Sequence, residues 1–301
     1  MMNFKYYIIL IIGIFLALGL GILVGISLEN KNILENQQKQ LTKQIEEEFN
    51  IIRTQTEQWK NNYIQLEQQK QQIDWLCNVL FDEIIKDKLS DIRVTFISLG
   101  ENNSIYQDII SILENAGAKI SSSYIINSSL NEEISQIYSQ YSDTQDMPLT
   151  SLYQYMGQDL IFSITEGQNV NSVYELIQNG AIKNTVNIED GCNAIILSGD
   201  YIKDKNFELL TQGIVKAAQD LDIAIIGISN SSYDIEKSTY RNLGISTIEN
   251  IDSLYGRLCL VSLLCGNSGN YGIREQANGI LPDPLFPADI RSIYNHEKGD
   301  R

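Results

Sequence analysis

Histidine is almost absent from this 301-residue sequence, whose single copy is His296 near the C-terminal end. Serine- and cysteine-based mechanisms need a neighbouring base, usually a histidine, so most of the chain lacks that catalytic partner. The phosphate-binding motif G-x-x-x-x-G-K-[ST] and the nucleophile elbow G-x-S-x-G are missing as well. The sequence therefore favours a protein that is not an enzyme and holds no organic cofactor.

Cysteine is also scarce, and its four copies form no metal-binding pattern. Cys77, Cys192, Cys259 and Cys265 include no C-x-x-C pair, and their spacing is not that of a disulfide framework. The last three are interpreted as small buried apolar residues. No zinc site is predicted.

Positive charge is in short supply, with 22 Lys and Arg against 38 Asp and Glu and a formal net charge of −16. A surface of this sign repels phosphate backbones and anionic lipid headgroups. Nucleic acid is therefore excluded as an expected partner.

Glycine and proline are missing from Glu29 to about Lys86, where Gln, Glu, Lys and Asn dominate. Without these helix breakers, the segment is expected to form one long helix. From Ile45 onward, apolar residues recur at alternating spacings of four and three over six heptads, which is typical of a coiled coil. Thr56 and Lys70 interrupt the series and can fix its register.

We predict that this seam joins two copies of the chain in parallel. The alternative is a single amphipathic helix that packs on its own head domain. In the parallel dimer, the two copies of Cys77 would face each other, either as buried thiols or joined in a disulfide. The predicted seam consists of Ile45, Phe49, Ile52, Trp59, Tyr63, Leu66, Ile73, Cys77, Leu80 and Ile84.

What the chain does have is one long apolar run, Ile8 to Ile26, with 19 residues and no polar side chain. As a helix it is about 28 Å long, close to the thickness of a bilayer core of ~30 Å. The alternative is a cleaved signal peptide, whose apolar region is shorter and ends in small residues. We predict a permanent single-pass anchor, with the N-terminus in the cytoplasm and the bulk of the chain outside.

The anchor carries a stripe of small residues, Gly13, Ala17, Gly21 and Gly25, that recur every four positions. Such a stripe lies on one face of the helix and lets two membrane helices approach closely. It is predicted to pack one anchor against another.

The rest of the chain alternates strand and helix patterns. Strands are predicted at 91–99, 119–126, 194–197, 223–228 and 246–251, and helices at 104–117, 152–160, 172–179, 207–221, 233–243 and 253–265. The middle strands are unbroken apolar runs, which indicate a parallel sheet covered on both faces. The predicted fold class is α/β, with a doubly wound, mostly parallel, Rossmann- or flavodoxin-like head.

The sequence thus divides into an anchor at 1–28, a coiled-coil stalk at 29–89, a head at 90–266 and a tail at 267–301. Three of the four prolines are in the tail. The tail is expected to be an extended arm over the head or toward a partner, with a turn at Gly269–Gly272.

Ligands of such sheets bind at the carboxyl ends of the strands. The residues there that are candidates for contacting a partner or ligand are Glu101, Asn102, Asp200, Asn230 and Tyr271. Glu101 and Asp200 would form a carboxylate pair if their strands are neighbours, and are otherwise solvated loop acids.

Two segments together resemble a known family. Asn3-Phe-Lys-Tyr6 leads into the apolar segment Phe15–Gly25, and Gly266-Asn-Ser-Gly-Asn-Tyr-Gly272 is followed by Leu281-Pro282. These segments, and the order of anchor, coiled coil, head and tail, resemble the bacterial copper transporter MctB family with its SteB-like members. The resemblance implies either copper handling in the cell envelope or a membrane-anchored partner in envelope and cell-separation functions. It supplies no copper ligands.

Three hypotheses follow. The first is a dimeric, membrane-tethered scaffold that presents its head to an envelope or cell-division protein. The second is a copper-homeostasis protein, although Cys259 and Cys265 are predicted on different sides of one helix and Met147 and Met156 stand alone. A third is a head that binds a nucleotide or acts as an enzyme.

Overall fold

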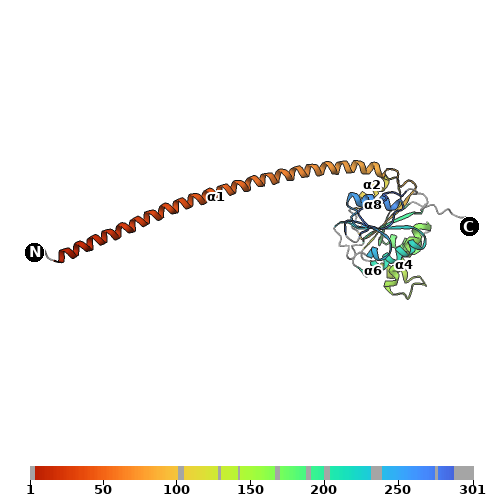
Figure 1. Cartoon of the computed structure of the whole chain (residues 1–301). Helices are drawn as coiled ribbons and strands as arrows, with labels where there is room; N and C mark the ends of the chain where they lie inside the picture. The colour runs from red at the N-terminus through yellow and green to blue at the C-terminus, as the bar shows by residue number, and fades with distance from the viewer. Residues whose placement is uncertain are drawn as a thin grey trace. The chain divides into compact units, whose positions relative to one another are not determined.

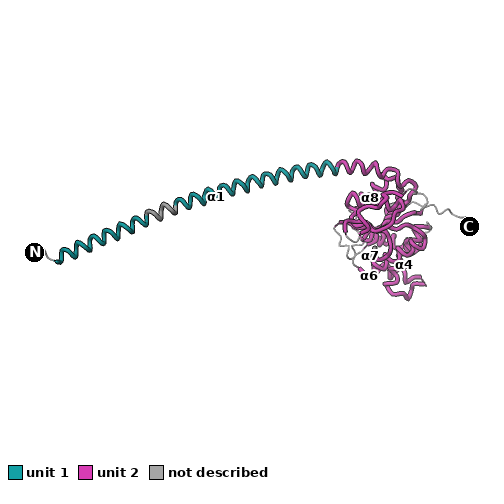
Figure 2. Tube along the Cα trace, viewed as in Figure 1, with its two compact units in different colours: residues 1–74 teal, residues 75–301 magenta. Residues whose placement is uncertain are grey.

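The computed structural model describes residues 4–100, 105–127, 130–141, 143–166, 170–187, 191–199, 204–231, 239–274 and 277–287. The chain divides into two compact units, residues 1–74 and residues 75–301 (Figure 2).

Residues 4–74 form most of helix α1, which extends from Phe4 to Ile85 (Figure 1). Its first part, Phe4–Ser27, has a mean hydropathy of 3.0, and its side chains are exposed. This segment is long and apolar enough to cross a membrane. The predicted apolar N-terminal helix is confirmed. The predicted stalk is helical as far as Ile85, and its pairing with a second chain stays a prediction.

The described part of residues 75–301 contains a seven-stranded sheet in the order β3-β2-β1-β4-β5-β6-β7. All neighbouring strands are parallel except β2 and β3. The strands are β1 (Arg93–Leu99), β2 (Lys119–Ile126), β3 (Ile182–Asn187), β4 (Ala194–Ser198), β5 (Ala224–Ile228), β6 (Ser246–Ile248) and β7 (Asn270–Tyr271). The predicted α/β head with a mostly parallel sheet is therefore confirmed, with the antiparallel β3 added at one edge.

Helices cover both faces of this sheet. They are α2 (Tyr106–Asn115), α3 (Asn131–Tyr138), α4 (Leu149–Glu166), α5 (Asn171–Gln178), α6 (Lys205–Asp220), α7 (Thr239–Asn242) and α8 (Leu254–Leu264). Figure 1 shows α2 and α8 on one side of the sheet and α4 and α6 on the other. This arrangement creates two apolar cores with the sheet between them.

The alternation of strand residues explains the two cores. In β1, Val94 and Phe96 pack with α2 and α8, whereas Ile97 and Leu99 pack with α4 and α6. Because successive side chains of a strand point to opposite faces, a strand buried on both faces is apolar at nearly every position, and Thr95 and Ser98 are the buried polar residues of β1. That is why the middle strands read as unbroken apolar runs.

The end of α1 belongs to the core on the α2 and α8 face. Phe81 and Ile85 are buried there, together with Leu89 in the turn that follows. Burial of these side chains against the sheet therefore secures the last turns of α1 within residues 75–301.

The helices α4 and α6 cross closely because glycines replace side chains at their contact. A Cβ atom on Gly157 would lie 2.5 Å from the backbone oxygen of Leu210, and one on Gly213 would collide with the backbone oxygen of Gln154. The crossing therefore requires glycine on both helices.

The tail contributes to the sheet. Asn270 and Tyr271 pair with Thr247 and Ile248 of β6, so the turn predicted at Gly269–Gly272 is wrong and the segment forms strand β7. The physical reason is an edge on β6 whose backbone groups accept another strand.

Residues 277–287 then lie against α8. The Cys259 thiol donates to the Ile280 oxygen at 3.1 Å, the Ser262 hydroxyl donates to the Leu285 oxygen, and Asn267 Nδ2 donates to the Pro284 oxygen at 3.0 Å. The tail is thus held to the head through its backbone carbonyls.

Candidate functional site

The strand order changes direction between β1 and β4, and this is where doubly wound sheets bind ligands. The two strands are parallel neighbours, as the carboxylate-pair hypothesis requires. Gly199, with φ of 125°, brings the end of β4 so close to β1 that a Cβ there would lie 2.5 Å from the Leu99 oxygen. The candidate residues Glu101, Asn102 and Asp200 lie outside the described residues.

The other two loop candidates lie farther along the same edge of the sheet. Asn230 follows β5 and is half-buried. Tyr271 belongs to β7 and packs in the core beside α8. Its hydroxyl donates to the backbone carbonyl oxygen of Ser268 at 3.2 Å. The structure therefore places them on separate elements, and Tyr271 has a packing role.

The loops after β5 and β6 are tied together by polar side chains. Ser231 donates from its backbone N–H and its hydroxyl to Asp252 Oδ1, at 2.8 and 2.7 Å. Asn250, only 4% exposed, donates from Nδ2 to the Ser231 hydroxyl at 3.0 Å, and its Oδ1 accepts from the Ile273 N–H at 3.3 Å. These groups hold the loops in place.

A pocket of about 350 Å³ opens among α3, α4, the N-terminus of α5 and the turns between α3 and α4. This volume lies in the range of small-molecule sites. The sequence did not predict this pocket, because its lining comes from segments that are separated along the chain and meet only in the fold. The lining residues are Tyr138, Tyr141, Asp143, Thr144, Tyr155, Asp159, Val170, Asn171 and Ser172.

Asp159 accepts hydrogen bonds from two other residues of this pocket. The Tyr138 hydroxyl and the Ser172 hydroxyl both donate to its Oδ2, at 2.9 and 2.7 Å. Burial, and then the charge of Asp159, raise the pKa of Tyr138 well above its ordinary value of 10.0. Tyr138 therefore stays a neutral hydrogen-bond donor at physiological pH.

The cysteines of α8 are buried and separate. Cys259 donates to the Ile280 oxygen, whereas Cys265 donates to the Lys88 oxygen at 3.7 Å, so the two thiols face different segments. Burial raises the pKa of Cys259 to about 12 and that of Cys265 to about 11. Both thiols are protonated at neutral pH, whereas the form that binds a metal is the thiolate.

The family described as "Copper transport outer membrane protein, MctB" matches residues 1–282 of this chain. The chain belongs to the MctB family. The resemblance noted in the sequence is thereby confirmed over nearly the whole chain. No curated protein matches the chain.

For an MctB-family protein, the placement of soft metal ligands matters, because Cu(I) prefers thiolate, thioether and imidazole groups. Within the described ranges, no three His, Cys, Asp or Glu side chains gather in a geometry that could hold a metal ion. Met156 is fully buried in the core beside α4 and α6, and Met147 packs against the same core.

The predicted seam of α1 is exposed in the single chain. Its apolar side chains are exposed, while Cys77 is half-buried. The exposed members are Ile45, Phe49, Ile52, Trp59, Tyr63, Leu66, Ile73, Leu80 and Ile84. The small-residue stripe Gly13, Ala17, Gly21 and Gly25 belongs to the apolar span, and a Cβ on each of its glycines would meet no atom within 4 Å.

Proposed function

We propose that this MctB-family protein is a membrane-anchored, dimeric scaffold of the cell envelope that performs no catalysis. In this proposal, two chains pair in parallel along α1 and present their α/β heads to an envelope or cell-division partner. The observation that carries it is the long row of exposed apolar side chains on α1. Exposed apolar surface of this extent is typical of a protein–protein contact.

The spacing of that row supports pairing with a second helix. Apolar side chains at intervals of four and three residues keep one seam facing a partner through many turns. Exposed residues such as Phe49, Trp59 and Leu66 would become the knobs of such a seam. A second copy of the chain offers the same pattern in the same register.

The membrane segment supports the same arrangement. Gly21-x-x-x-Gly25 lets two membrane helices come close enough for backbone contact. Anchors that pack in this way hold two chains side by side where α1 leaves the membrane. In this proposal the N-terminus lies in the cytoplasm and the head lies outside.

Oxidative cross-linking through Cys77 tests this pairing in the full chain. A parallel, in-register dimer places the two Cys77 thiols opposite each other, so diamide, which takes up two electrons and two protons, should join them in a disulfide. We expect a covalent dimer that forms in the parent protein and is lost in Cys77→Ser. Failure of the parent to cross-link in the membrane would contradict parallel, in-register pairing.

The second candidate function is copper transport or copper homeostasis in the envelope. The observation that favours it is the match of the family described as a copper transport outer membrane protein. In this case copper is the cargo of the protein. A Cu(I) titration of the full chain against a competing chelator, under reducing conditions, tests it.

Binding tighter than micromolar that disappears in the Cys259→Ser, Cys265→Ser double variant would make copper handling the leading function. That result requires the buried thiols to become accessible, because each is hydrogen-bonded to a backbone oxygen. No binding above the chelator baseline would favour the scaffold.

A further inference from the structure

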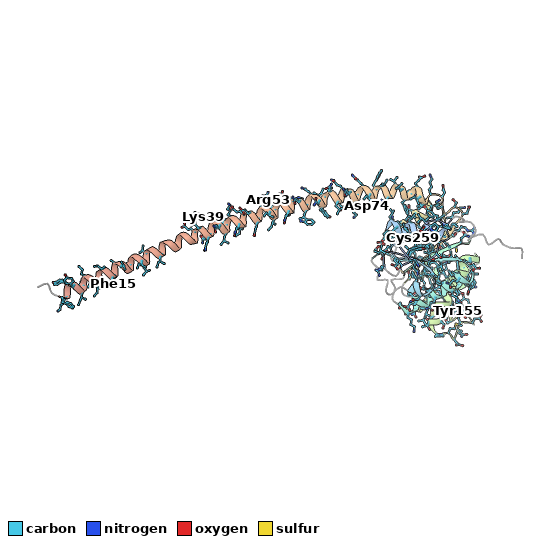
Figure 3. The ribbon with its side chains drawn as sticks, in the orientation of Figure 1. Phe15, Lys39, Arg53, Asp74, Tyr155 and Cys259 are labelled. Carbon is cyan, nitrogen blue, oxygen red and sulfur yellow. The ribbon has the colours of Figure 1, made fainter. Side chains whose placement is uncertain are left out.

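We propose that the pocket among α3, α4 and α5 is a binding site for the ammonium or guanidinium group of a small organic cation or of a lysine or arginine side chain. This site is independent of the pairing along α1. Figure 3 shows Tyr155, one of its lining residues, at the edge of residues 75–301 and on the side of the fold opposite to Cys259.

Three tyrosines give the pocket aromatic walls. Tyr138 and Tyr141 come from the end of α3 and the turn after it, with ring centroids 6.4 Å apart and ring planes inclined by 59°. Tyr155 comes from α4 and is 40% exposed, so part of its ring is open to solvent. The face of an aromatic ring is negative and attracts a cation held over it.

Asp159 supplies a negative charge to the same pocket. It stands one helical turn after Tyr155 on α4, so the two side chains share one face of the helix. Its Oδ2 accepts from Tyr138 and Ser172, whereas Oδ1 accepts no hydrogen bond within the part of the chain that the structure describes. Oδ1 is therefore the acceptor that a ligand's N–H group can reach.

The surroundings of the pocket favour positive over negative ligands. Two of the described lining residues, Asp143 and Asp159, are acidic, and none is Lys, Arg or His. A further acid, Glu175, lies near Tyr141. Burial, and then the charge of Glu175, raise the pKa of the Tyr141 hydroxyl above its ordinary value of 10.0. A phosphate or carboxylate would be repelled here, whereas a cation would be attracted.

The pocket is preorganised by hydrogen bonds that do not involve a ligand. Thr144 is buried, and its hydroxyl donates to the backbone carbonyl oxygen of Tyr138 at 2.6 Å. This hydrogen bond holds the turn after α3 against that helix. The bonds from Tyr138 and Ser172 fix the Asp159 carboxylate in one orientation. A site whose charged group is already in place loses less entropy when it binds.

The test measures binding of blocked amino acids to the full chain in detergent by ligand-observed NMR. The probes are Nα-acetyl-lysine methylamide and Nα-acetyl-arginine methylamide, and the neutral control of similar shape is Nα-acetyl-norleucine methylamide. We expect both cations to bind and the norleucine compound to bind at least about tenfold more weakly, the size of one hydrogen bond to a charged group. Equal binding of cation and control would overturn the proposal.

Substitutions then locate the site. Asp159→Asn should weaken binding of the cations by about tenfold or more, while Asp146→Asn, an exposed acid of the same turn region outside the lining, should leave it unchanged. Tyr155→Ala should weaken binding and Tyr155→Phe should retain it, because the ring and not the hydroxyl faces the cation. Unchanged binding in both Asp159→Asn and Tyr155→Ala would refute the site.

The same titration distinguishes the source of the cation. A dilysine peptide that binds about tenfold more tightly than the single blocked lysine would assign the site to a basic protein segment. Equal affinity for the two would assign it to a small free amine. If a neutral disaccharide binds and neither the blocked lysine nor the blocked arginine does, the assignment is overturned, because the site would then be a carbohydrate site.

Discussion

Replacing Ile52, Leu66 and Ile73 together by serine should abolish the dimer. These side chains are 59, 64 and 60% exposed in the single chain, so their removal costs the folded head nothing in packing. They lie on the predicted seam at separations of 14 and seven residues, which spreads the damage over three heptads. The variant therefore tests pairing of the chains separately from folding of the head.

The size of the effect follows from the exposed fractions. Burying a whole Leu or Ile side chain contributes about 1.5–3 kcal/mol. Because about three-fifths of each side chain is available to a partner, and a dimer contains two copies of all three residues, the loss is about 5–11 kcal/mol. At 1.4 kcal/mol per tenfold, the dissociation constant should rise by about four to eight orders of magnitude.

Sedimentation velocity of the full chain in detergent measures the mass of the protein in each complex. The parent and all variants carry Gly21→Leu and Gly25→Leu, so that close packing of the membrane helices cannot hold the dimer. The matched control is Ile51→Ser with Ile64→Ser, which removes exposed apolar side chains, 56 and 44% exposed, from the opposite side of the helix. The control should remain dimeric.

A triple serine variant that is as dimeric as its parent would refute the reasoning. So would a control that dissociates to the same degree, because the seam would then have no special part in the contact. Far-UV circular dichroism accompanies both measurements, and it should show no loss of folded α/β head in any of these proteins.

Three further predictions concern the head. Gly213→Ala should lower its free energy of unfolding by about 1–3 kcal/mol, because the new Cβ meets the backbone of α4, whereas its exposed neighbour Gln212→Ala should not; chemical denaturation measures both. Ser253→Ala should cost about 1 kcal/mol, because the serine hydroxyl caps α8 by accepting from the Gly256 N–H at 3.0 Å, and an unchanged midpoint would contradict this. Since burial raises the pKa of Cys259 from 9.0 to about 12, its contribution to stability is complete below pH 9 and is lost as the pH rises through about 12; at pH 8 a thiolate-specific reagent should therefore reach Cys259 only after unfolding.

The alternating pattern of the head was readable from the sequence because it is local. A fully buried strand is a run of apolar residues, and a covering helix shows its periodicity within a few turns. The strands around residues 94, 196 and 226 and the helix at Lys205–Asp220 were recognised in this way. The apolar span Phe4–Ser27 is even clearer, because it needs only length and composition.

Two strands escaped prediction because their formation depends on distant partners. β3, Ile182–Asn187, contains Lys183, Asn184 and Thr185 and has no apolar run, so only its antiparallel pairing with β2 makes it a strand. β7 has two residues and is defined by its pairing with β6. Edge strands of this kind bury one face or less, so their sequences carry a weak signal.

The pocket could not have been predicted for a related reason. Tyr138, Tyr155, Asp159 and Ser172 come from three helices, and no spacing along the chain brings them together. Tyr155 and Asp159 are four residues apart on α4, which was the only local hint that they share a face. The hydrogen bonds to Asp159 exist only once α3, α4 and α5 have packed.

The sequence by itself determined the apolar N-terminal helix, the long helix that follows and the α/β class of the head, because each of these depends on the composition or the periodicity of neighbouring residues. The tertiary structure alone decided the order of the strands, the two edge strands, the tie of the tail to α8 and the pocket lined by Asp159. These features join residues that are tens of positions apart, and only the packing of both faces of the sheet brings them into contact.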